Sequence, residues 1–452
     1  MNVQRRVFVQ IPSYRDPQLI PTLIDLIENA SAPGAIRVVV CWQHGPDEDL
    51  AAFTACGFRL GSTDAIHGHL VHSLELRGVA VELIDIAFEN AEGAGWARSV
   101  AQQRYQGEAY NLQIDAHHRF VKAWDREMIG MLESLMSIST KPLLTGHPPA
   151  FWPETYPAGR QEQPTIMYVA NFSALGIVRF MAKLVAPASL RSRPWRARFM
   201  SGGFVFSPGS FIREVAQDPS HYFATEEVIM TVRAYTHGYD MFHADRVLLW
   251  HYYGNRSPKV WEDHADDQAS SPPPARTVDE RVLGSARRAR SLLGLDSDSD
   301  GRHDTSFGLG TVRTLQEYER YAGVSFSLRG VHESTTAGGE PDESLLDVDG
   351  ADWEMRLVCR RRIRVVVSFD PTEEIQLYSA YVAMRTACGE VVVVKDLSGQ
   401  EIIALLASGT LAFVYEHSSN PKGLPAAFGV EAATNYPDAE RFFSVIAQDI
   451  LD

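Results

Sequence analysis

Residues 113–118 read Gln-Ile-Asp-Ala-His-His and end an apolar strand. Side chains two residues apart on an extended segment point the same way, so Asp115 and His117 can face one ligand together. A second apolar strand, Val247–Trp250, is followed directly by His251. These three side chains could bind one divalent cation, and mixed oxygen and nitrogen ligands suit Mn²⁺ or a similar ion better than Ca²⁺. The alternative is a turn with a surface histidine, which is the commoner origin of an isolated Asp-x-His.

The first 120 residues alternate short β-rich runs with helical segments. This order predicts an α/β fold, a mostly parallel sheet with helices on its faces, in which ligands gather beyond the carboxyl ends of the strands. The loop Ser13–Asp16 and the segment Asp115–His117 both follow strands, so we expect them to face the same crevice. The predicted strands are Val7–Ile11, Ile36–Trp42, Val79–Ile86 and Tyr110–Asp115, and the predicted helices are Pro21–Asn29 and Trp96–Tyr105.

Length and composition exclude several classes of protein. A chain of 452 residues exceeds one typical core, so two domains are expected. The formal charge of −15 argues against nucleic acid or an anionic membrane as the main partner, because both require a basic surface. No apolar run approaches the roughly 20 residues that span a bilayer. We therefore expect a soluble, cytoplasmic protein without a membrane span.

A second α/β unit is predicted near the C-terminus. The stretch from Gly330 to Gly350 is polar and contains several glycines, which is typical of a linker. Beyond it, strands are predicted at Ile363–Phe369, Glu390–Lys395 and Thr410–Tyr415, and helices at Glu373–Thr386, Gly399–Ala407 and from Asp438 onward. The expected organisation is a first domain over residues 1–328, a linker over residues 329–350 and a small accessory domain over residues 351–452.

Several segments match one known family in the same order along the chain. They are Phe8–Pro17, Val40–Gln43, Gly93–Arg98, Gln113–Phe120, Ser201–Ser207, Thr225–Val228, Thr236–Asp240, Leu249–Tyr253 and Gly308–Tyr318. This ordered set resembles the GlcNAc-transferase family whose best-known members modify a hydroxyproline of a cytosolic ubiquitin-ligase subunit. The resemblance implies a retaining glycosyltransferase of the GT-A type, with a Rossmann-like mixed sheet that binds a nucleotide-sugar.

The metal pattern is also similar to that of the mucin-type polypeptide GalNAc-transferases. By this resemblance Asp115, His117 and His251 would bind Mn²⁺ or Mg²⁺, which would hold the diphosphate of a UDP-sugar. A cation on the phosphates stabilises the negative charge that develops as the nucleoside diphosphate departs. The resemblance favours UDP-GlcNAc as the donor and a hydroxyl group on a peptide, a protein or a small molecule as the acceptor.

The resemblance also assigns a donor pocket. Its predicted residues are Pro12, Ser13, Tyr14, Arg15, Asp16, Arg98, Gln113, Asp115, Gly202 and Gly203. Tyr14 would stack on the base and Asp16 would accept ribose hydroxyls, although Asp16 could equally cap the following helix. Arg98 could reach the diphosphate or could lie on the surface of its helix. The two glycines would let the backbone approach a sugar closely, or would form a bulge.

Glu226 and Glu227 are the candidate catalytic residues. In the resembling families an acidic residue here touches the donor sugar or the acceptor hydroxyl, whereas the simpler alternative is a favourable charge at a helix N-terminus. Burying both carboxylates would strain the site, and the family pattern slightly favours Glu227. In a same-face attack the leaving diphosphate helps to take the acceptor proton, so such a glutamate would position the reactants and would not act as a base.

Alternatives from other classes stay open. A non-catalytic nucleotide-sugar or glycan-binding module would usually lose its metal ligands, whereas all three are present here. A metal-dependent hydrolase or nucleotidyltransferase would normally supply more carboxylates around two metals, and no cluster of Asp and Glu lies near Asp115 in the sequence. The accessory domain could bind a peptide leader or a carrier, or could form a homodimer contact. His67, His69 and His72 have a metal-like spacing, but they lie in a polar, glycine-containing loop region without a carboxylate partner, and we expect them to be solvated.

Overall fold

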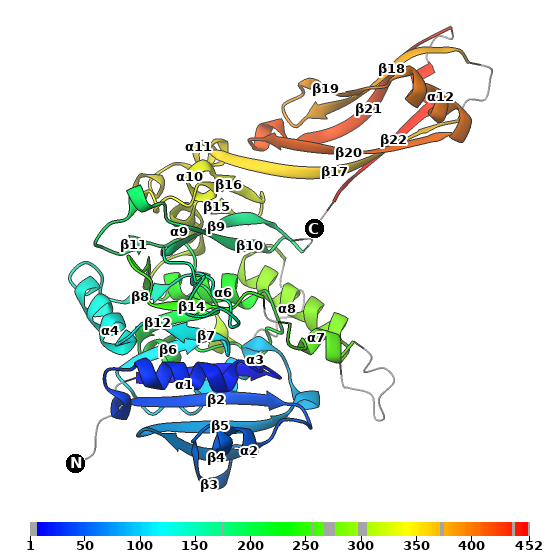
Figure 1. Cartoon of the computed structure of the whole chain (residues 1–452). Coiled ribbons are helices and arrows are strands. Elements are labelled where there is room, and N and C mark those ends of the chain that lie inside the picture. The colour runs from blue at the N-terminus through cyan, green and yellow to red at the C-terminus, as the bar shows by residue number, and fades with distance from the viewer. Residues whose placement is uncertain are drawn as a thin grey trace. The chain divides into compact units, whose positions relative to one another are not determined.

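The computed structural model describes residues 7–450 apart from residues 174, 255, 266–275, 297–304, 371–374 and 436–438. The chain divides into two compact units (Figure 1). Unit 1 comprises Met1–Ala170, Arg179–Tyr318 and Gly338–Pro341, and unit 2 comprises Asn171–Val178, Glu319–Ala337 and Asp342–Asp452. All of the predicted site residues belong to unit 1.

A mixed sheet of ten described strands forms the centre of unit 1. Its strands lie in the order β11 (Trp195–Arg196), β13 (Asp240–His243), β8 (Pro142–Thr145), β12 (Phe204–Pro208), β6 (Tyr110–Ile114), β1 (Val7–Tyr14), β2 (Ile36–His44), β5 (Val79–Ala87), β4 (His69–Leu76) and β3 (Arg59–Ile66). The neighbours β6, β1, β2 and β5 are parallel, whereas β12 is antiparallel to β6 and β4 is antiparallel to β5. This arrangement confirms the predicted α/β class with a mixed sheet.

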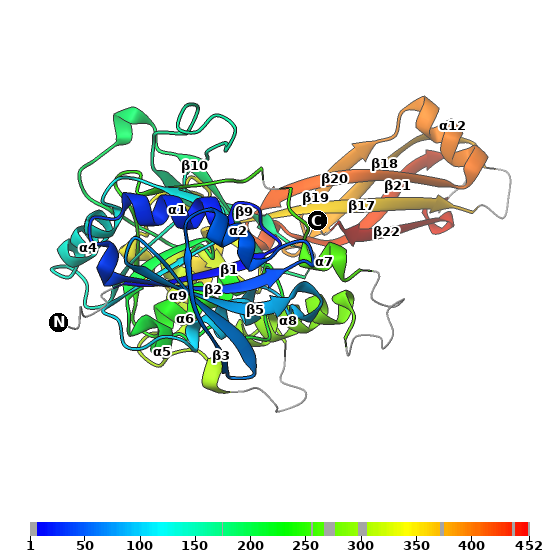
Figure 2. The same ribbon diagram turned by 60° about the horizontal axis from the view of Figure 1, so that its bottom comes forward.

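Helices cover both faces of this sheet because its central strands are apolar on both sides. Alternate residues of β1 pack in opposite directions, since side chains on a strand alternate faces. Ile11 packs with helices α1 (Leu19–Asn29) and α4 (Trp124–Leu135), whereas Phe8 packs with α3 (Ala94–Gln102). Figure 2 shows α1 beside β1 and β2. Burial on both faces explains the continuous apolar runs of the parallel strands.

Shorter elements complete unit 1. The strands β7 (His118–Phe120) and β14 (Leu249–His251) form an antiparallel pair, and β9 (Thr165–Phe172) pairs with β10 (Val178–Leu184). The remaining helices are α2 (Leu50–Ala55), α5 (Phe211–Glu214), α6 (Glu226–Thr236), α7 (Val260–Asp263), α8 (Val278–Leu292) and α9 (Leu315–Ala322), the last of which continues into unit 2. None of the helices that the structure describes is long and apolar enough to cross a membrane.

Unit 2 consists mainly of antiparallel strands. One sheet has the order β15 (Val324–Ser325), β16 (Gly330–His332), β17 (Leu357–Phe369) and β20 (Thr410–Ser419), and β22 (Phe443–Asp449) also pairs with β17. A second sheet has the order β19 (Val391–Asp396), β18 (Leu377–Thr386) and β21 (Pro425–Thr434). The helices are α10 (Glu333–Thr336), α11 (Gly350–Met355) and α12 (Gly399–Ser408). Buried residues of both sheets and of α12 form one apolar core.

Two helix predictions in unit 2 are wrong. Leu377–Thr386, most of the predicted helix Glu373–Thr386, is the strand β18, and residues 373 and 374 lie outside the described part of the chain. The predicted closing helix contains β22 instead, and its first residue, Asp438, is also outside the described part. Pairing with β19 and β21 fixes β18 as a strand, because sheet partners override weak local preferences. The predicted linker over residues 329–350 contains β16 and α10.

Candidate functional site

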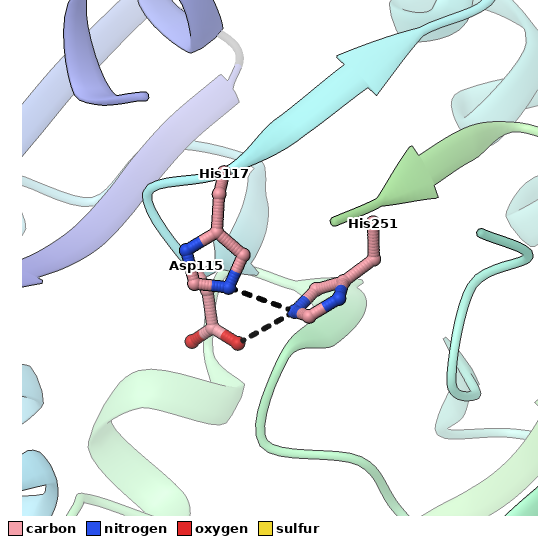
Figure 3. Close-up of side chains that lie close together, drawn as sticks. All are labelled: Asp115, His117 and His251. Carbon is pink, nitrogen blue, oxygen red and sulfur yellow. Dashed lines mark hydrogen bonds and ion pairs between the residues drawn. The ribbon is translucent and has the colours of Figure 1, made fainter. Parts of the chain in front are cut away.

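Asp115, His117 and His251 lie together at the carboxyl end of the central strands (Figure 3). Asp115 directly follows β6, and His251 is the last residue of β14, which pairs with β7 directly after His117. The two Nε2 atoms of the histidines are 3.0 Å apart, and His251 Nε2 is 3.5 Å from Asp115 Oδ2. One oxygen and two nitrogen atoms thus lie within 4.8 Å of one another, a donor set that fits a single divalent ion.

Asp16 orients one of these histidines. Its Oδ2 atom is 2.7 Å from His117 Nδ1, and its Oδ1 atom accepts a hydrogen bond of 2.8 Å from the backbone N–H of Gln18. A histidine that binds a metal through Nε2 usually donates its other ring N–H to a carboxylate, and Asp16 supplies that carboxylate. Asp16 thus closes the turn that precedes α1, whose N-cap residue is Gln18 without a side-chain cap, and the same side chain also fixes His117. Its predicted contact with a ribose stays a prediction.

Electrostatics favour the metal-binding states of Asp115 and His251. Burial alone would raise the pKa of Asp115, but His251, Arg98 and His117 hold that pKa well below its usual range. Burial lowers the pKa of His251, so its ring is neutral at neutral pH. Burial would also lower the pKa of His117, but the hydrogen bond and charge of Asp16, together with Asp115, raise it. An ion at His117 Nε2 would compete with a proton there, so we expect its binding to weaken as the pH falls.

Arg98 is a buried bridge between two carboxylates. Its Nη2 atom donates to Asp115 Oδ1 over 3.2 Å, and its Nη1 atom contacts Glu226 Oε1 at 3.5 Å. The side chain is 5% exposed, which excludes the surface alternative. The first N–H groups of helix α3, at Ala94 and Gly95, are bound by backbone carbonyls from a neighbouring segment. The positive charge next to Asp115 Oδ1 thus comes from the Arg98 guanidinium and not from the N-terminus of α3.

Gly202 and Gly203 allow this arrangement because neither carries a side chain. A Cβ atom at Gly202 would lie 3.1 Å from the guanidinium of Arg98, and one at Gly203 would lie 2.7 Å from Asp115 Oδ2. Gln113 donates a hydrogen bond of 2.8 Å to the carbonyl of Gly202 and accepts another from Gln217. Since Gln113 is only 1% exposed, its amide positions the glycine segment in this structure. A direct contact between Gln113 and the donor stays a prediction.

The two candidate glutamates have different surroundings. Glu226 faces Arg98 with a side chain 7% exposed, and burial raises its pKa despite that cation. Glu227 is 29% exposed, and its Oε1 atom accepts a hydrogen bond of 2.7 Å from the backbone N–H of Gly202. Burial would raise the pKa of Glu227, but His147, the Gly202 N–H and Arg98 lower it. Glu227 is therefore the more accessible carboxylate, and its surroundings favour its ionised form.

The predicted donor loop is held by a residue that the sequence does not signal. Asp263, in α7, accepts hydrogen bonds from the Tyr14 hydroxyl at 2.8 Å and from Arg15 at 2.9 Å. Burial and this bond raise the pKa of Tyr14. Pro12 and Ser13 belong to β1, and Ser13 is 1% exposed. The Oγ atom of Ser13 is buried and has no hydrogen-bond partner among the described residues, and a contact of either residue with the donor stays a prediction.

A cavity of about 720 Å³ opens beside Asp16. It is lined by Arg15, Asp16, Trp42, Asp47, Phe53, Glu154, Tyr252, Arg256 and ten further residues of the same segments. Its place beyond the carboxyl ends of β1 and β2 is where open α/β sheets bind ligands. The cavity combines aromatic rings with charged groups, as a pocket for a polar organic molecule does.

A family model described as Glycosyltransferase (GlcNAc) matches residues 6–56 and 59–328. No curated protein matches. Among solved structures, GalNAc-T7 with UDP, GalNAc and Mn²⁺ is 15% identical, with a TM-score of 0.42, over 64% of this chain and 48% of that chain. This chain thus spans about half the length of GalNAc-T7.

Two further structures resemble the chain over a similar range. Residues 1–349 of S. aureus TarS, in complex with UDP, are 12% identical, with a TM-score of 0.34, over 63% of this chain and 72% of that chain. The mannosyltransferase PcManGT from Pyrobaculum calidifontis, in complex with GDP-Man and Mn²⁺, is 11% identical, with a TM-score of 0.34, over 64% of this chain and 70% of that chain.

Proposed function

Because this chain belongs to the GlcNAc glycosyltransferase family, we propose that it transfers GlcNAc from UDP-GlcNAc to a hydroxyl group of a peptide, a protein or a small molecule. The proposal includes dependence on Mn²⁺, or on Mg²⁺, and retention of configuration at the sugar carbon. The family match covers every residue of the candidate site, from Pro12 to His251.

The convergence of Asp115, His117 and His251 carries this proposal. When bound there, the cation would hold the donor diphosphate and stabilise the charge of the leaving nucleoside diphosphate. Asp16 fixes the ring of His117, and Arg98 fixes the carboxylate of Asp115. The site is thus ordered before any ligand enters, which lowers the cost of arranging charges during the reaction.

The donor loop and the neighbouring cavity support a nucleoside site. Arg15 and Asp16 line the cavity of about 720 Å³, and Trp42 and Tyr252 add aromatic rings to its walls. A base and a ribose offer a flat ring and hydroxyl groups, which suit this mixture of aromatic and charged side chains. The metal site borders the same cavity through Asp16, so a diphosphate could extend from one to the other.

The reaction that we propose is an attack on the same face of the sugar from which the diphosphate leaves. The glycosidic bond to the diphosphate breaks, the acceptor oxygen bonds to the sugar carbon, and a diphosphate oxygen takes the acceptor proton. Glu227 is ionised and 29% exposed, so it can accept a hydrogen bond from a sugar or acceptor hydroxyl. Its part is to orient a reactant, because the leaving group serves as the base.

A screen of nucleotide-sugars tests this function. The full chain, stripped of metal, would be melted with UDP-GlcNAc, UDP-GalNAc, UDP-Glc or GDP-Man, with and without Mn²⁺, and each donor would be assayed for hydrolysis. We expect UDP-GlcNAc to raise the melting temperature and to be hydrolysed only when Mn²⁺ is present. Asp115→Asn should abolish hydrolysis with an unchanged circular dichroism spectrum, whereas Asp279→Asn, at an exposed helix position, should behave like the wild type.

The same screen separates the alternatives. Stabilisation by a UDP-sugar without turnover under any condition would favour a non-catalytic binding module. Stabilisation by GDP-Man alone would show that the donor is GDP-Man and not UDP-GlcNAc. If no nucleotide-sugar changed the melting temperature with Mn²⁺ present, the proposed function would be wrong.

A further inference from the structure

His147 lies beside the candidate glutamate, although nothing in the sequence pairs it with that residue. It follows β8, in the loop Gly146–Ala150, and its Nε2 atom is 3.6 Å from Glu227 Oε1. The same oxygen accepts the Gly202 N–H at 2.7 Å. Glu227 Oε1 is thus held from two sides by groups that belong to different parts of the chain.

The loop that carries His147 is fastened to the strand that carries His251. The backbone N–H of His251 donates to the carbonyl of Pro149 over 3.0 Å, and the backbone N–H of Phe151 donates to the carbonyl of His251 over 3.2 Å. The hydroxyl of Tyr253 donates to the carbonyl of Pro148 over 2.7 Å. The backbone that directly follows His147 is therefore held by the same strand that carries a candidate metal ligand.

Only one oxygen of the Glu227 carboxylate is used in this way. Within the described residues, Glu227 Oε2 makes no hydrogen bond, and 29% of the side chain is exposed. Glu226 contrasts with it, because its carboxylate is buried against Arg98. Because its Oε1 atom is fixed, the Glu227 carboxylate can present its Oε2 atom in a defined direction to the hydroxyl group of a ligand.

We propose that His147 is a positioning residue, which fixes Glu227 so that its second oxygen binds a hydroxyl group of the donor sugar or the attacking hydroxyl group. This role rests on the proposed glycosyl transfer. The lowered pKa of Glu227, to which His147 contributes, agrees with it. Loss of the imidazole leaves the carboxylate less oriented and easier to protonate, while the candidate metal ligands stay in place.

Substitution of His147 in the full chain tests the inference. With UDP-GlcNAc and Mn²⁺, we expect His147→Ala to lower kcat/KM for hydrolysis about 10-fold, because Glu227 loses an ion-pair partner 3.6 Å from its Oε1 atom. The Kd for Mn²⁺ should be unchanged. His147→Gln, which keeps an N–H donor, should recover much of the loss. His67→Asn, at an exposed position with a φ of 50° that asparagine tolerates, is the matched control.

The kinetic parameters show which hydroxyl group Glu227 binds. A higher KM for the donor would indicate the donor sugar, and a lower kcat at constant KM would indicate the attacking hydroxyl. The acidic limb of the pH–rate profile should move to higher pH in His147→Ala, because Glu227 loses a neighbour that keeps it ionised; a merely structural role would not move it. Wild-type kinetics and pH profile in His147→Ala would overturn this inference alone, whereas an inactive wild type would overturn it together with the proposed function.

Discussion

His117 and His251 direct their Nε2 atoms at each other over 3.0 Å, although 134 positions separate them in the chain. The antiparallel pairing of β7 with β14, in which His118 lies opposite His251, creates this approach. Two imidazole nitrogens at this distance can share one proton, or both can bind one ion. The pKa of His117 is raised because Asp16 lies at its Nδ1 atom, whereas burial lowers the pKa of His251. The two rings therefore have unequal surroundings.

Replacing Asp16 tests whether this carboxylate orients His117 for metal binding. Asp16→Asn removes the negative charge next to His117 Nδ1 but keeps the size of the side chain. We expect the affinity for Mn²⁺ to fall by about 10- to 100-fold, as is usual when the partner of a metal-binding histidine is changed. Titration calorimetry measures this affinity, and Asp279→Asn serves as the control. An affinity equal to that of the wild type would show that Asp16 does not support a metal ligand.

Adding one methyl group at Gly203 should displace a metal ligand without unfolding the protein. The new Cβ atom would lie 2.7 Å from Asp115 Oδ2, and the carboxylate can move away because it is the end of a side chain. We expect Gly203→Ala to lower donor hydrolysis by about 100-fold, since a shift of about 1 Å at a reacting site has effects of this size.

The matched control for Gly203→Ala is Gly130→Ala in helix α4, where a Cβ atom meets nothing within 4 Å. Gly130→Ala should keep full activity and gain about 0.5–1 kcal/mol of stability, because alanine has the better helix propensity. Full activity in Gly203→Ala would mean that the observed orientation of Asp115 is not required.

Asp85 gives a prediction about pH and stability. Its carboxylate contacts His72 Nε2 at 2.8 Å and His44 Nε2 at 2.9 Å; burial would raise its pKa, but these two partners lower it. A carboxyl whose pKa is lower in the folded state stabilises the fold above its unfolded pKa of about 3.9, and this contribution is lost as the pH falls through the folded pKa.

We therefore expect Asp85→Asn to destabilise the fold by about 1–3 kcal/mol at pH 7, the usual range for hydrogen bonds to a charged group, and by much less near pH 3. Urea denaturation at both pH values measures the difference. Asp64→Asn on β3, where the residue is exposed, is the control. An equal loss of stability at both pH values would contradict the assignment of the effect to the charge of Asp85.

The sequence predicted the strands of the central sheet, and it predicted that Asp115 and His117 face the same way. Both predictions depend on a short apolar run that ends in polar residues. The partners of His147 and of Tyr14 could not be predicted, since Glu227 and Asp263 approach them only through packing of distant segments. The expectation that His72 is solvated was wrong for a similar reason. Its carboxylate partner lies on β5, and the register of β4 with β5 brings the two together.

The predicted linker and the following segment share an apolar cluster, which gives a test of unit 2. Trp353 in α11 is 6% exposed and packs with Leu345 and Leu357, on either side of it in the chain. We expect Trp353→Ala to destabilise unit 2 by about 3–5 kcal/mol, the usual cost of removing a buried large aromatic side chain. In calorimetry of the full chain, the unfolding transition of unit 2 should move to a lower temperature, and Mn²⁺ and UDP should not change that temperature.

Donor hydrolysis should be retained in Trp353→Ala at temperatures below that transition, because every candidate site residue belongs to unit 1. Tyr378→Ala, which removes an aromatic ring that is 64% exposed, is the control and should leave both transitions unchanged. If Trp353→Ala abolished donor hydrolysis at the temperatures where unit 2 is unfolded and unit 1 is still folded, the transferase site would depend on unit 2 for its own structure. Retained hydrolysis with a loss of transfer to an acceptor would instead assign acceptor binding to unit 2.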